Sequence, residues 1–297
     1  MNTLNTATIS PDSVQTEQNQ GMPQVQPMSD YEKFLFDLKG FLVIPNVLTD
    51  EEIETVREHT QTYVKKPESL PEHHRSPIVG PVEFLIDHPR VMGILQEVID
   101  PRRERIRLES VFISRRSVEN TNNQWRPHVG GMNLDPSLSY RFHNGRIYGG
   151  MTRIVWELNE VVKGQGGTCL VPGSHKANLA SAQDGTWPQQ ADAPDSGVWE
   201  TYGCPAGSLV VFSEGVRHTG SNWTNPSNPR CAILIAYNHV TVRFHEPKPC
   251  MNPVVIGGLS HPRQKFFGDV WILGNDRRNK VNKKAANGER QTEGEQP

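Results

Sequence analysis

The sequence Gln-Trp-Arg-Pro-His-Val-Gly-Gly occupies residues 124–131, within the strand-rich part of the chain. Side chains alternate along an extended strand, so His128 and the residue two positions later point to the same side. Iron sites built from two histidines and a carboxylate use this spacing, with Asp or Glu at the second position. Here the second position is Gly130. The stretch therefore predicts either a metal site that lacks one protein ligand or no metal site at all.

Length and composition favour one large domain with tails over two small domains. The chain has 297 residues, of which 22% are charged, and a formal net charge of −2, which suggests neither a nucleic-acid-binding surface nor an acidic disordered protein. No basic start is followed by an apolar run, and no stretch approaches the ~20 apolar residues of a membrane helix. We therefore expect a cytoplasmic protein without a membrane partner. Its thiols, which fall singly and form no CxxC pair, are expected to be reduced: Cys169, Cys204, Cys231 and Cys250.

Both ends of the chain differ in composition from the middle. Residues 1–28 are rich in Asn, Gln, Thr, Ser and Pro and lack Lys and Arg, so they cannot bury enough apolar surface to offset the entropy of ordering. Residues 275–297 are polar and partly basic, which is more typical of a solvated tail than of a nucleic-acid contact. The prediction is a disordered tail over 1–28, a folded domain over 29–274 and a second tail over 275–297.

The N-terminal part of the domain predicts helices. Tyr31, Phe34, Leu35 and Leu38 recur at helical spacing before Gly40, and a short apolar strand follows at 41–44. Residues 49–52 (Thr-Asp-Glu-Glu) form a capping box that opens a helix to about residue 64. A further helix is expected over residues 87–99.

After residue 101 the composition of the chain favours β-strands. Segments 106–114, 151–158, 209–212 and 231–242 are rich in β-branched and aromatic residues and are separated by Gly, Pro, Asn and Ser. Helices followed by many strands argue for a sheet sandwich or barrel buttressed by helices, not for alternating βαβ units. Residues 177–203 carry few apolar side chains and predict a long excursion, a common form of lid over a site.

Two further motifs follow His128 in the sequence. Residues 166–176 (Gly-Gly-Thr-Cys-Leu-Val-Pro-Gly-Ser-His-Lys) combine a glycine-rich turn, an apolar run and a Pro-Gly turn. Residues 207–218 contain the apolar segment 209–212 and end at His218, and Arg230 follows twelve residues later at the head of the next strand. A jelly roll can bring His128 and His218 together by pairing strands that are distant in sequence.

Together with the Gly-Phe-Leu-Val-Ile-Pro-Asn-Val-Leu-Thr opening at 40–49, these motifs resemble the phytanoyl-CoA dioxygenase family of iron(II)/2-oxoglutarate oxygenases, over residues 31–244. The resemblance implies a double-stranded β-helix (jelly roll, cupin-like), mainly β with N-terminal helices. It implies Fe(II) held by His128 and His218, and Arg230 on the distal carboxylate of 2-oxoglutarate. Trp156 falls near a tryptophan that lines the co-substrate site in some members. The implied partners are a small-molecule substrate and O2.

Gly130 departs from the family pattern, which places an aspartate there. Without that carboxylate, one position on the iron stays vacant. Non-haem iron halogenases are similar in having Gly or Ala at this position, where a halide such as chloride fills the vacancy. The other interpretations are that water fills it, that a carboxylate such as Asp135 swings in, or that the site has lost its iron.

The sequence thus predicts an iron(II)/2-oxoglutarate-dependent oxidoreductase that functionalises an aliphatic C–H bond of a small molecule. Gly130 favours halogenation over hydroxylation, and a catalytically silent jelly-roll binding protein is the alternative of another class. Candidate substrate contacts are Gln124, Arg126 and His143, with a surface hairpin as the competing interpretation for His143. His175 is expected to shape its loop, and His73 and His74 to be solvated.

Overall fold

The computed structural model describes residues 24–120, 125–130, 139–177, 189–244 and 252–270. Most of both predicted tails lies outside the described residues, as do Gln124, Asp135 and Cys250. The packed chain begins before the predicted boundary at residue 29. Met28 is buried in the core, and the Gln26 amide donates to the carbonyl of Pro89. Residues 24–28 therefore belong to the domain, because one large apolar side chain and a backbone hydrogen bond anchor them.

The N-terminal elements follow the sequence signals. They are α1 (Asp30–Lys39), β1 (Phe41–Ile44), α2 (Asp50–Lys65) and α3 (Pro89–Val98). Capping boxes open α1 and α2, the second being the predicted Thr49–Glu52 pair, and Gly40 ends α1 at a φ of 80°. The predicted apolar face of α1 is wrong: Tyr31, Phe34 and Leu38 are exposed, while Phe36 is fully buried. The packed face of this helix is therefore rotated from the one that spacing alone indicated.

The remaining helices are short. The α-helices are α4 (Pro253–Gly257) and α5 (His261–Gln264), and the 3-10 turns are Pro67–Ser69, Glu72–His74, Gly80–Ile86, Arg103–Arg105, Ser174–Lys176, Gln189–Asp192 and Lys265–Phe267. Among the described residues, no helix is long and apolar enough to cross a bilayer.

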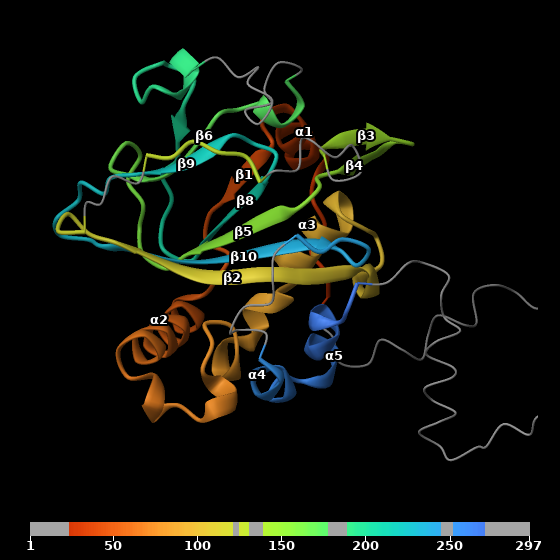
Figure 1. Cartoon of the computed structure of the whole chain (residues 1–297), viewed down its shortest axis with the longest axis vertical. Coiled ribbons are helices and arrows are strands. Elements are labelled where there is room, and N and C mark those ends of the chain that lie inside the picture. The colour runs from red at the N-terminus through yellow and green to blue at the C-terminus, as the bar shows by residue number, and fades with distance from the viewer. Residues whose placement is uncertain (1–23, 121–124, 131–138, 178–188, 245–251, 271–297) are drawn as a thin grey trace, which may run out of the picture.

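The larger of two facing sheets has five antiparallel strands in the order β1-β8-β5-β10-β2. Besides β1, it contains β2 (Ile106–Arg116), β5 (Thr152–Glu157), β8 (Ser208–Ser213) and β10 (Arg230–His239). Each predicted strand segment is confirmed to within a few residues. In Figure 1 helices α2, α4 and α5 lie below this sheet and strands β6 and β9 lie above it.

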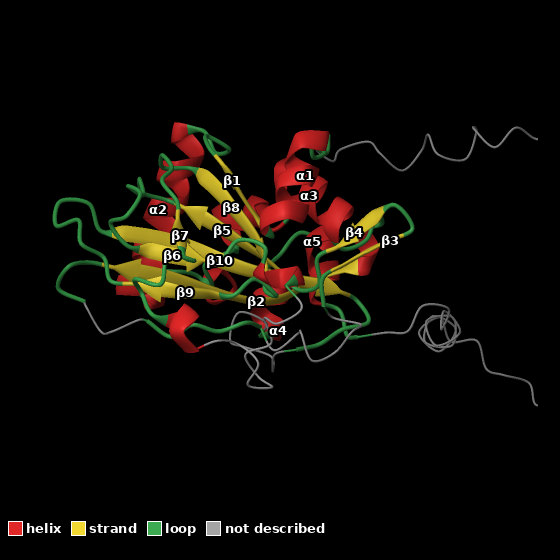
Figure 2. Ribbon diagram, turned by 90° about the horizontal axis from the view of Figure 1, so that it is seen from above, coloured by secondary structure: helices red, strands yellow, loops and turns green. Residues whose placement is uncertain are grey.

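The smaller sheet has three antiparallel strands in the order β7-β6-β9. These are β6 (Gly167–Leu170), β7 (Glu200–Thr201) and β9 (His218–Ser221), and Figure 2 shows them as a layer over the larger sheet. A separate hairpin joins β3 (Arg141–His143) and β4 (Arg146–Tyr148) through Asn144 and Gly145, both at positive φ. The predicted jelly-roll class with N-terminal helices is confirmed.

The two faces of the larger sheet have different roles. Ile154, Trp156 and Ile233 point to the helices and join the main hydrophobic core. Val155 and Leu234, on the opposite face, join a second apolar cluster between the sheets. The inner face therefore forms the interior of the jelly roll, where the candidate site lies.

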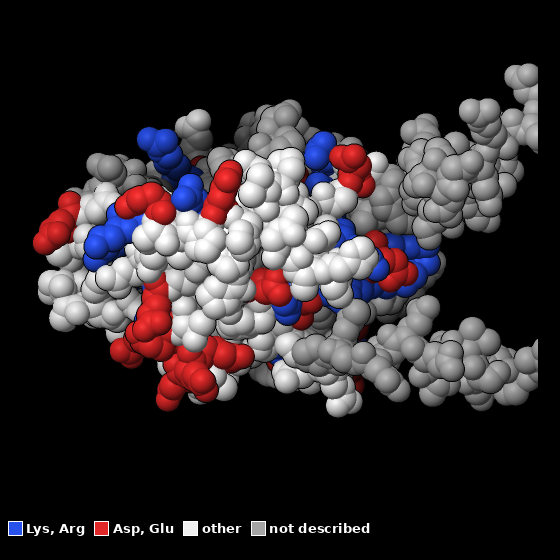
Figure 3. Space-filling model, turned by 90° about the horizontal axis from the view of Figure 1, so that it is seen from below, with Lys and Arg blue, Asp and Glu red and all other residues white. Residues whose placement is uncertain are grey.

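The face of the molecule seen from below carries charges of both signs. Figure 3 shows acidic side chains gathered on one part of it, next to smaller groups of basic ones. A surface of this kind does not attract an anionic ligand from a distance.

Candidate metal centre and co-substrate site

The jelly roll brings His128 and His218 side by side. The two residues form an isolated antiparallel bridge, in which each amide donates to the carbonyl of the other over 3.0 and 2.9 Å. Their ring centroids are 4.2 Å apart. The pairing that the two motifs predicted is therefore built into the backbone.

Both imidazoles are oriented by backbone carbonyls. Nδ1 of His128 lies 2.8 Å from the Arg126 oxygen, and Nδ1 of His218 lies 2.7 Å from the Val216 oxygen. A carbonyl only accepts, so each Nδ1 carries the proton and each Nε2 keeps its lone pair. Metal-binding histidines are held in this way, and the pair fits an iron(II) ion.

His218 is suited to act as a neutral ligand. Burial lowers its pKa to about 4, although the neighbouring Glu214 opposes this effect. The ring is therefore unprotonated at neutral pH, the form that binds a metal.

A carboxylate that the sequence analysis missed lies beside the pair. Glu214 is 3% exposed, and its Oε2 is 3.5 Å from Nε2 of His218. Burial alone would raise the pKa of Glu214, but the Arg153 guanidinium, which donates to Oε1, and His218 together hold this pKa below its usual value. Glu214 is therefore an anion at the histidine pair.

Gly130 packs directly against Glu214. Its amide donates to the Glu214 carbonyl over 2.8 Å. A Cβ added at Gly130 would lie 2.9 Å from Cβ and 3.2 Å from Oε2 of Glu214. The space that a side chain at position 130 would need is therefore taken by Glu214.

The fold preassembles a pair of ligands, not a finished triad. Across the described segments, no group of three or more His, Cys, Asp or Glu side chains is arranged to hold a metal ion. His218 and Glu214 are buried, whereas His128 is exposed. A metal ion would be approached from the His128 side.

Arg230 lies in the interior, as the resemblance implied, but it has a partner there. Its Nε donates to both oxygens of Glu157 at 3.1 Å, and further bonds reach the hydroxyls of Ser114, Thr168 and Tyr202. Arg230 is 2% exposed and Glu157 is fully buried. This ion pair keeps Arg230 charged, and Glu157 was not anticipated from the sequence.

A second arginine lies next to Arg230. Arg116 is its partner in the β10–β2 register, and the Arg116 Nε is buried without a hydrogen-bond partner among the described residues. A Cβ at Gly220 would lie 2.6 Å from the Arg116 guanidinium, so this glycine lets the side chain cross β9. Gly220 follows His218 by two positions and shares its strand face. The two arginines and Glu157 together carry one net positive charge beside β9.

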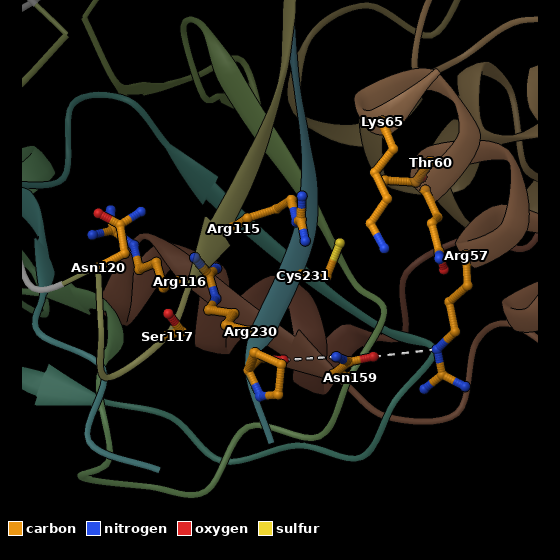
Figure 4. Close-up of a pocket in the computed structure, with 12 residues that line it drawn as sticks. Arg57, Thr60, Lys65, Arg115, Arg116, Ser117, Asn120, Asn159, Arg230 and Cys231 are labelled. Carbon is orange, nitrogen blue, oxygen red and sulfur yellow. Dashed lines mark hydrogen bonds between the residues drawn. The ribbon is translucent and has the colours of Figure 1, made fainter. Parts of the chain in front are cut away.

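A basic cavity of about 390 Å³ opens beside α2, where β2 ends at Arg116 and β10 begins at Arg230, with both arginines in its wall. Figure 4 shows Arg57 and Lys65 on the helix side, and Asn159 hydrogen-bonded to Arg57. Among the described residues, the lining contains no Asp or Glu but several basic residues: Arg57, Lys65, Arg115, Arg116 and Arg230. Such a lining favours an anion.

The assignment of Trp156 to the co-substrate site is wrong. Trp156 is fully buried on the helix-facing side of β5, where its ring packs edge-on against His88 at 5.4 Å. Its neighbours Val155 and Glu157 face the interior instead. A shift of one residue along a strand reverses the face, which is why the loose alignment at this position failed.

The candidate substrate contacts stay near the surface. Arg126 precedes His128 with an exposed side chain, and its amide donates to the Thr219 hydroxyl over 2.8 Å. His143 is exposed on the β3–β4 hairpin. His73 is exposed and His74 half-buried. Arg126 alone of these lies beside the histidine pair.

The excursion after β6 returns to this region. Arg217, next to His218, forms an ion pair with Asp192, and the indole of Trp125 donates to the Asp192 carbonyl over 2.7 Å. Trp125 also packs edge-on against Trp199, with ring centroids 4.9 Å apart. The described part of the excursion is thereby fixed next to both histidines, while residues 178–188 lie outside the described residues.

His175 ties the Pro-Gly turn to α1. It is buried, its Nε2 lies 3.1 Å from the Asp37 carbonyl, and its ring packs edge-on against Tyr140 at 4.4 Å. A Cβ at Gly40 would lie 2.5 Å from its Nδ1, so the glycine makes this contact sterically feasible. The position is that of a loop-shaping residue.

The burial of His175 predicts acid sensitivity. Burial lowers its pKa to about 4, so between the ordinary value near 6.5 and 4 the unfolded chain binds a proton that the folded chain does not. The corresponding stability is present above pH 6.5 and falls by about 3 kcal/mol as the pH drops to 4. Urea unfolding of wild type and His175→Gln at both pH values checks this: the variant should lose less stability on acidification. An equal loss in both proteins would contradict the assignment.

Comparison with known protein families identifies the class of protein to which the chain belongs. The model of the family "Phytanoyl-CoA dioxygenase (PhyH)" matches residues 36–232. The chain belongs to this family, whose members are non-haem iron and 2-oxoglutarate-dependent oxygenases, and it is an oxidoreductase of that class with Fe(II) and 2-oxoglutarate as cofactors.

Solved structures share the fold at low identity. HygX from Streptomyces hygroscopicus, solved with nickel and 2-oxoglutarate, is 18% identical with a TM-score of 0.59, covering 77% of this chain and 94% of its own. EctD from S. alaskensis in its apoform is 14% identical with a TM-score of 0.55, covering 77% and 89%. The carbocyclase SnoK from nogalamycin biosynthesis is 18% identical with a TM-score of 0.52, covering 71% and 84%. A search of curated protein sequences finds no match.

Proposed function

We propose that this protein uses Fe(II), 2-oxoglutarate and O2 to oxygenate an aliphatic C–H bond of a small molecule. His128 and His218 would hold the iron, and Arg230 together with Arg116 would bind the distal carboxylate of 2-oxoglutarate. The observation that carries the proposal is the bridged histidine pair, whose Nδ1 atoms are both engaged by backbone carbonyls. This arrangement leaves two Nε2 lone pairs for one ion.

Iron and 2-oxoglutarate supply the oxidising chemistry when bound, and the protein's part is to bind and orient. An arginine engages a carboxylate through a planar fork of donors, which fixes the pose of the co-substrate. Glu157 holds Arg230 rigidly, while Arg116 contributes the uncompensated charge. Phe212, an apolar side chain between the sheets, packs against the His218 ring with centroids 4.9 Å apart and covers that side of the pair.

Anaerobic titration with Fe(II) and 2-oxoglutarate tests this function. The wild-type protein should develop the visible charge-transfer absorption of a chelated 2-oxoglutarate, and O2 should then convert 2-oxoglutarate to succinate. The His128→Ala variant should show neither signal, whereas His143→Ala, a change on the exposed hairpin, should show both. Absence of the absorption in the wild-type protein would favour a silent binding protein.

Arg116 offers a separate prediction. Replacement by methionine should weaken 2-oxoglutarate binding about 10- to 100-fold, because a charge-assisted hydrogen bond is lost, and should leave Fe(II) affinity unchanged. Arg115→Met is the matched control, since Arg115 also lines the basic cavity but is exposed and adjacent on the strand. Equal 2-oxoglutarate affinity in the wild-type protein and both variants would exclude a role for Arg116.

Halogenation is the second candidate, and Gly130 is the observation that favours it. The neighbouring Glu214 opposes it, because two unit negative charges ~4 Å apart repel by about 4 kcal/mol at an effective dielectric constant of about 20. We therefore expect turnover in the presence of chloride to give an oxygenated product without chlorine. Mass spectrometry would identify the product. A chlorinated product that depends on chloride would reverse this preference.

A further inference from the structure

The iron site of the proposed function has two protein ligands from the family pattern and a glycine in place of the third. Oxygen and nitrogen ligands about 2.1 Å from one octahedral ion lie ~3 Å from each other. Glu214 Oε2 and His218 Nε2 are 3.5 Å apart, close to that spacing. The two atoms therefore have nearly the separation of adjacent ligands before any metal is bound.

We propose that Glu214 supplies the carboxylate ligand that Gly130 lacks, so that iron is held by His128, His218 and Glu214. The carboxylate then enters from the turn after β8 instead of from the strand of His128. This inference rests on the iron site of the proposed function. Ion binding requires the exposed His128 ring and the Glu214 side chain to turn toward the ion.

The two carboxylate oxygens of Glu214 make different contacts. Arg153 donates to Oε1, and the same guanidinium reaches the Ser110 hydroxyl at 3.3 Å and lies 5.3 Å from the centroid of the Phe112 ring. Oε2 is left facing His218. An arginine that holds one oxygen while the other faces the metal position is a typical outer-shell arrangement for a ligating carboxylate.

Gly130 and Glu214 are sterically linked. A side chain at position 130 would meet Glu214 at 2.9 Å, a distance at which one of the two must move. An aspartate at 130 and a glutamate at 214 therefore compete for one space. Glycine at position 130 therefore leaves the room that the Glu214 side chain needs. In this proposal the Glu214 carboxylate fills the position beside the iron that a halide would otherwise take.

Fe(II) affinity tests the proposal without relying on turnover. Anaerobic calorimetry would give the Kd for Fe(II) in the wild-type protein, Glu214→Gln, the double variant Glu214→Ala with Gly130→Asp, and the control Glu160→Gln, which changes an exposed glutamate. The visible spectrum with Co(II) would report changes in the ligand set. Thermal melting would verify that each variant is folded, and glutamine keeps the shape and one acceptor for Arg153.

We expect Glu214→Gln to weaken Fe(II) binding by more than about 100-fold, beyond the loss typical of a residue that only supports a ligand, and to alter the Co(II) spectrum. The double variant, which moves the carboxylate to position 130, should recover to within about 10-fold of the wild-type Kd. Glu160→Gln should match wild type. These results together would support Glu214 as the third ligand.

An Fe(II) Kd for Glu214→Gln equal to that of wild type, with an unchanged Co(II) spectrum, would overturn the inference and leave the two-histidine site intact. Loss in Glu214→Gln without recovery in the double variant would make Glu214 a positioning residue for His218 and would also overturn it. Absence of Fe(II) binding by the wild-type protein would instead refute the proposed function itself.

Discussion

Replacement of His218 by alanine is expected to weaken Fe(II) binding by more than about 100-fold and to abolish 2-oxoglutarate turnover. Changes in residues that only support a metal ligand cost about 10- to 100-fold in affinity, so removal of one of the two bridged histidines should cost more. Anaerobic calorimetry with Fe(II), followed by a succinate assay, would measure both effects.

His175→Ala is the matched control for this experiment. Both histidines are buried and hydrogen-bonded to a backbone carbonyl, but the His175 ring packs against Asp37 of α1 and Tyr140 and does not pair with His128 as His218 does. Its removal should lower stability and leave the Kd for Fe(II) unchanged. A similar loss of Fe(II) affinity in both variants would mean that His218 acts through folding, which contradicts its assignment as a ligand.

The second large effect is expected at the buried ion pair of Arg230 and Glu157. Glu157→Ala should lower the free energy of unfolding by about 3–5 kcal/mol, because it leaves the Arg230 charge buried without its counterion. The double variant Glu157→Leu with Arg230→Met should recover most of this loss, since apolar side chains of similar volume often replace a buried pair at little cost. It should not recover 2-oxoglutarate binding. Urea denaturation and 2-oxoglutarate titration would measure the two properties separately.

Glu200→Gln provides the surface comparison. Glu200 also pairs with a cation, Lys39 at 3.0 Å, but both side chains are more than one third exposed. Its loss should change the free energy of unfolding by less than about 1 kcal/mol. If Glu157→Ala destabilised the protein no more than Glu200→Gln, the burial of the Arg230–Glu157 pair would be refuted.

Local signals predicted the framework well. The Thr49–Glu52 capping box and Gly40 mark helix ends through their own hydrogen bonds and backbone angles, so short sequence windows suffice to find them. The segments rich in β-branched residues form the strands that their composition predicted. In contrast, which side of α1 packs depends on distant elements, and for that reason spacing selected Tyr31 and Phe34 instead of Phe36.

The site was only partly predictable. His128 and His218 belong to motifs, whereas the roles of Glu157 and Glu214 depend on which strands are neighbours. One signal was available: Arg153 and Glu157 lie four positions apart on the same face of an otherwise apolar strand, and buried charges require partners. The partners themselves are Glu214, in the turn after β8, and Arg230, in β10, and they appear only once the register is known.

The structure changes the interpretation of Gly130. In the sequence it indicated an open position on the metal, which favoured a halide. In the fold it makes room for Glu214, a carboxylate from another part of the chain. The same residue thus argues for halogenation when it is considered alone and against it when its neighbour is included.

A crystal structure of the protein grown anaerobically with Fe(II) and 2-oxoglutarate, with anomalous data at the iron edge, tests the central claim most directly. We predict a single strong anomalous peak bonded to Nε2 of His128 and Nε2 of His218, with the distal carboxylate of 2-oxoglutarate at Arg116 and Arg230. A peak elsewhere, or an occupied 2-oxoglutarate site with no iron between the two histidines, would contradict it.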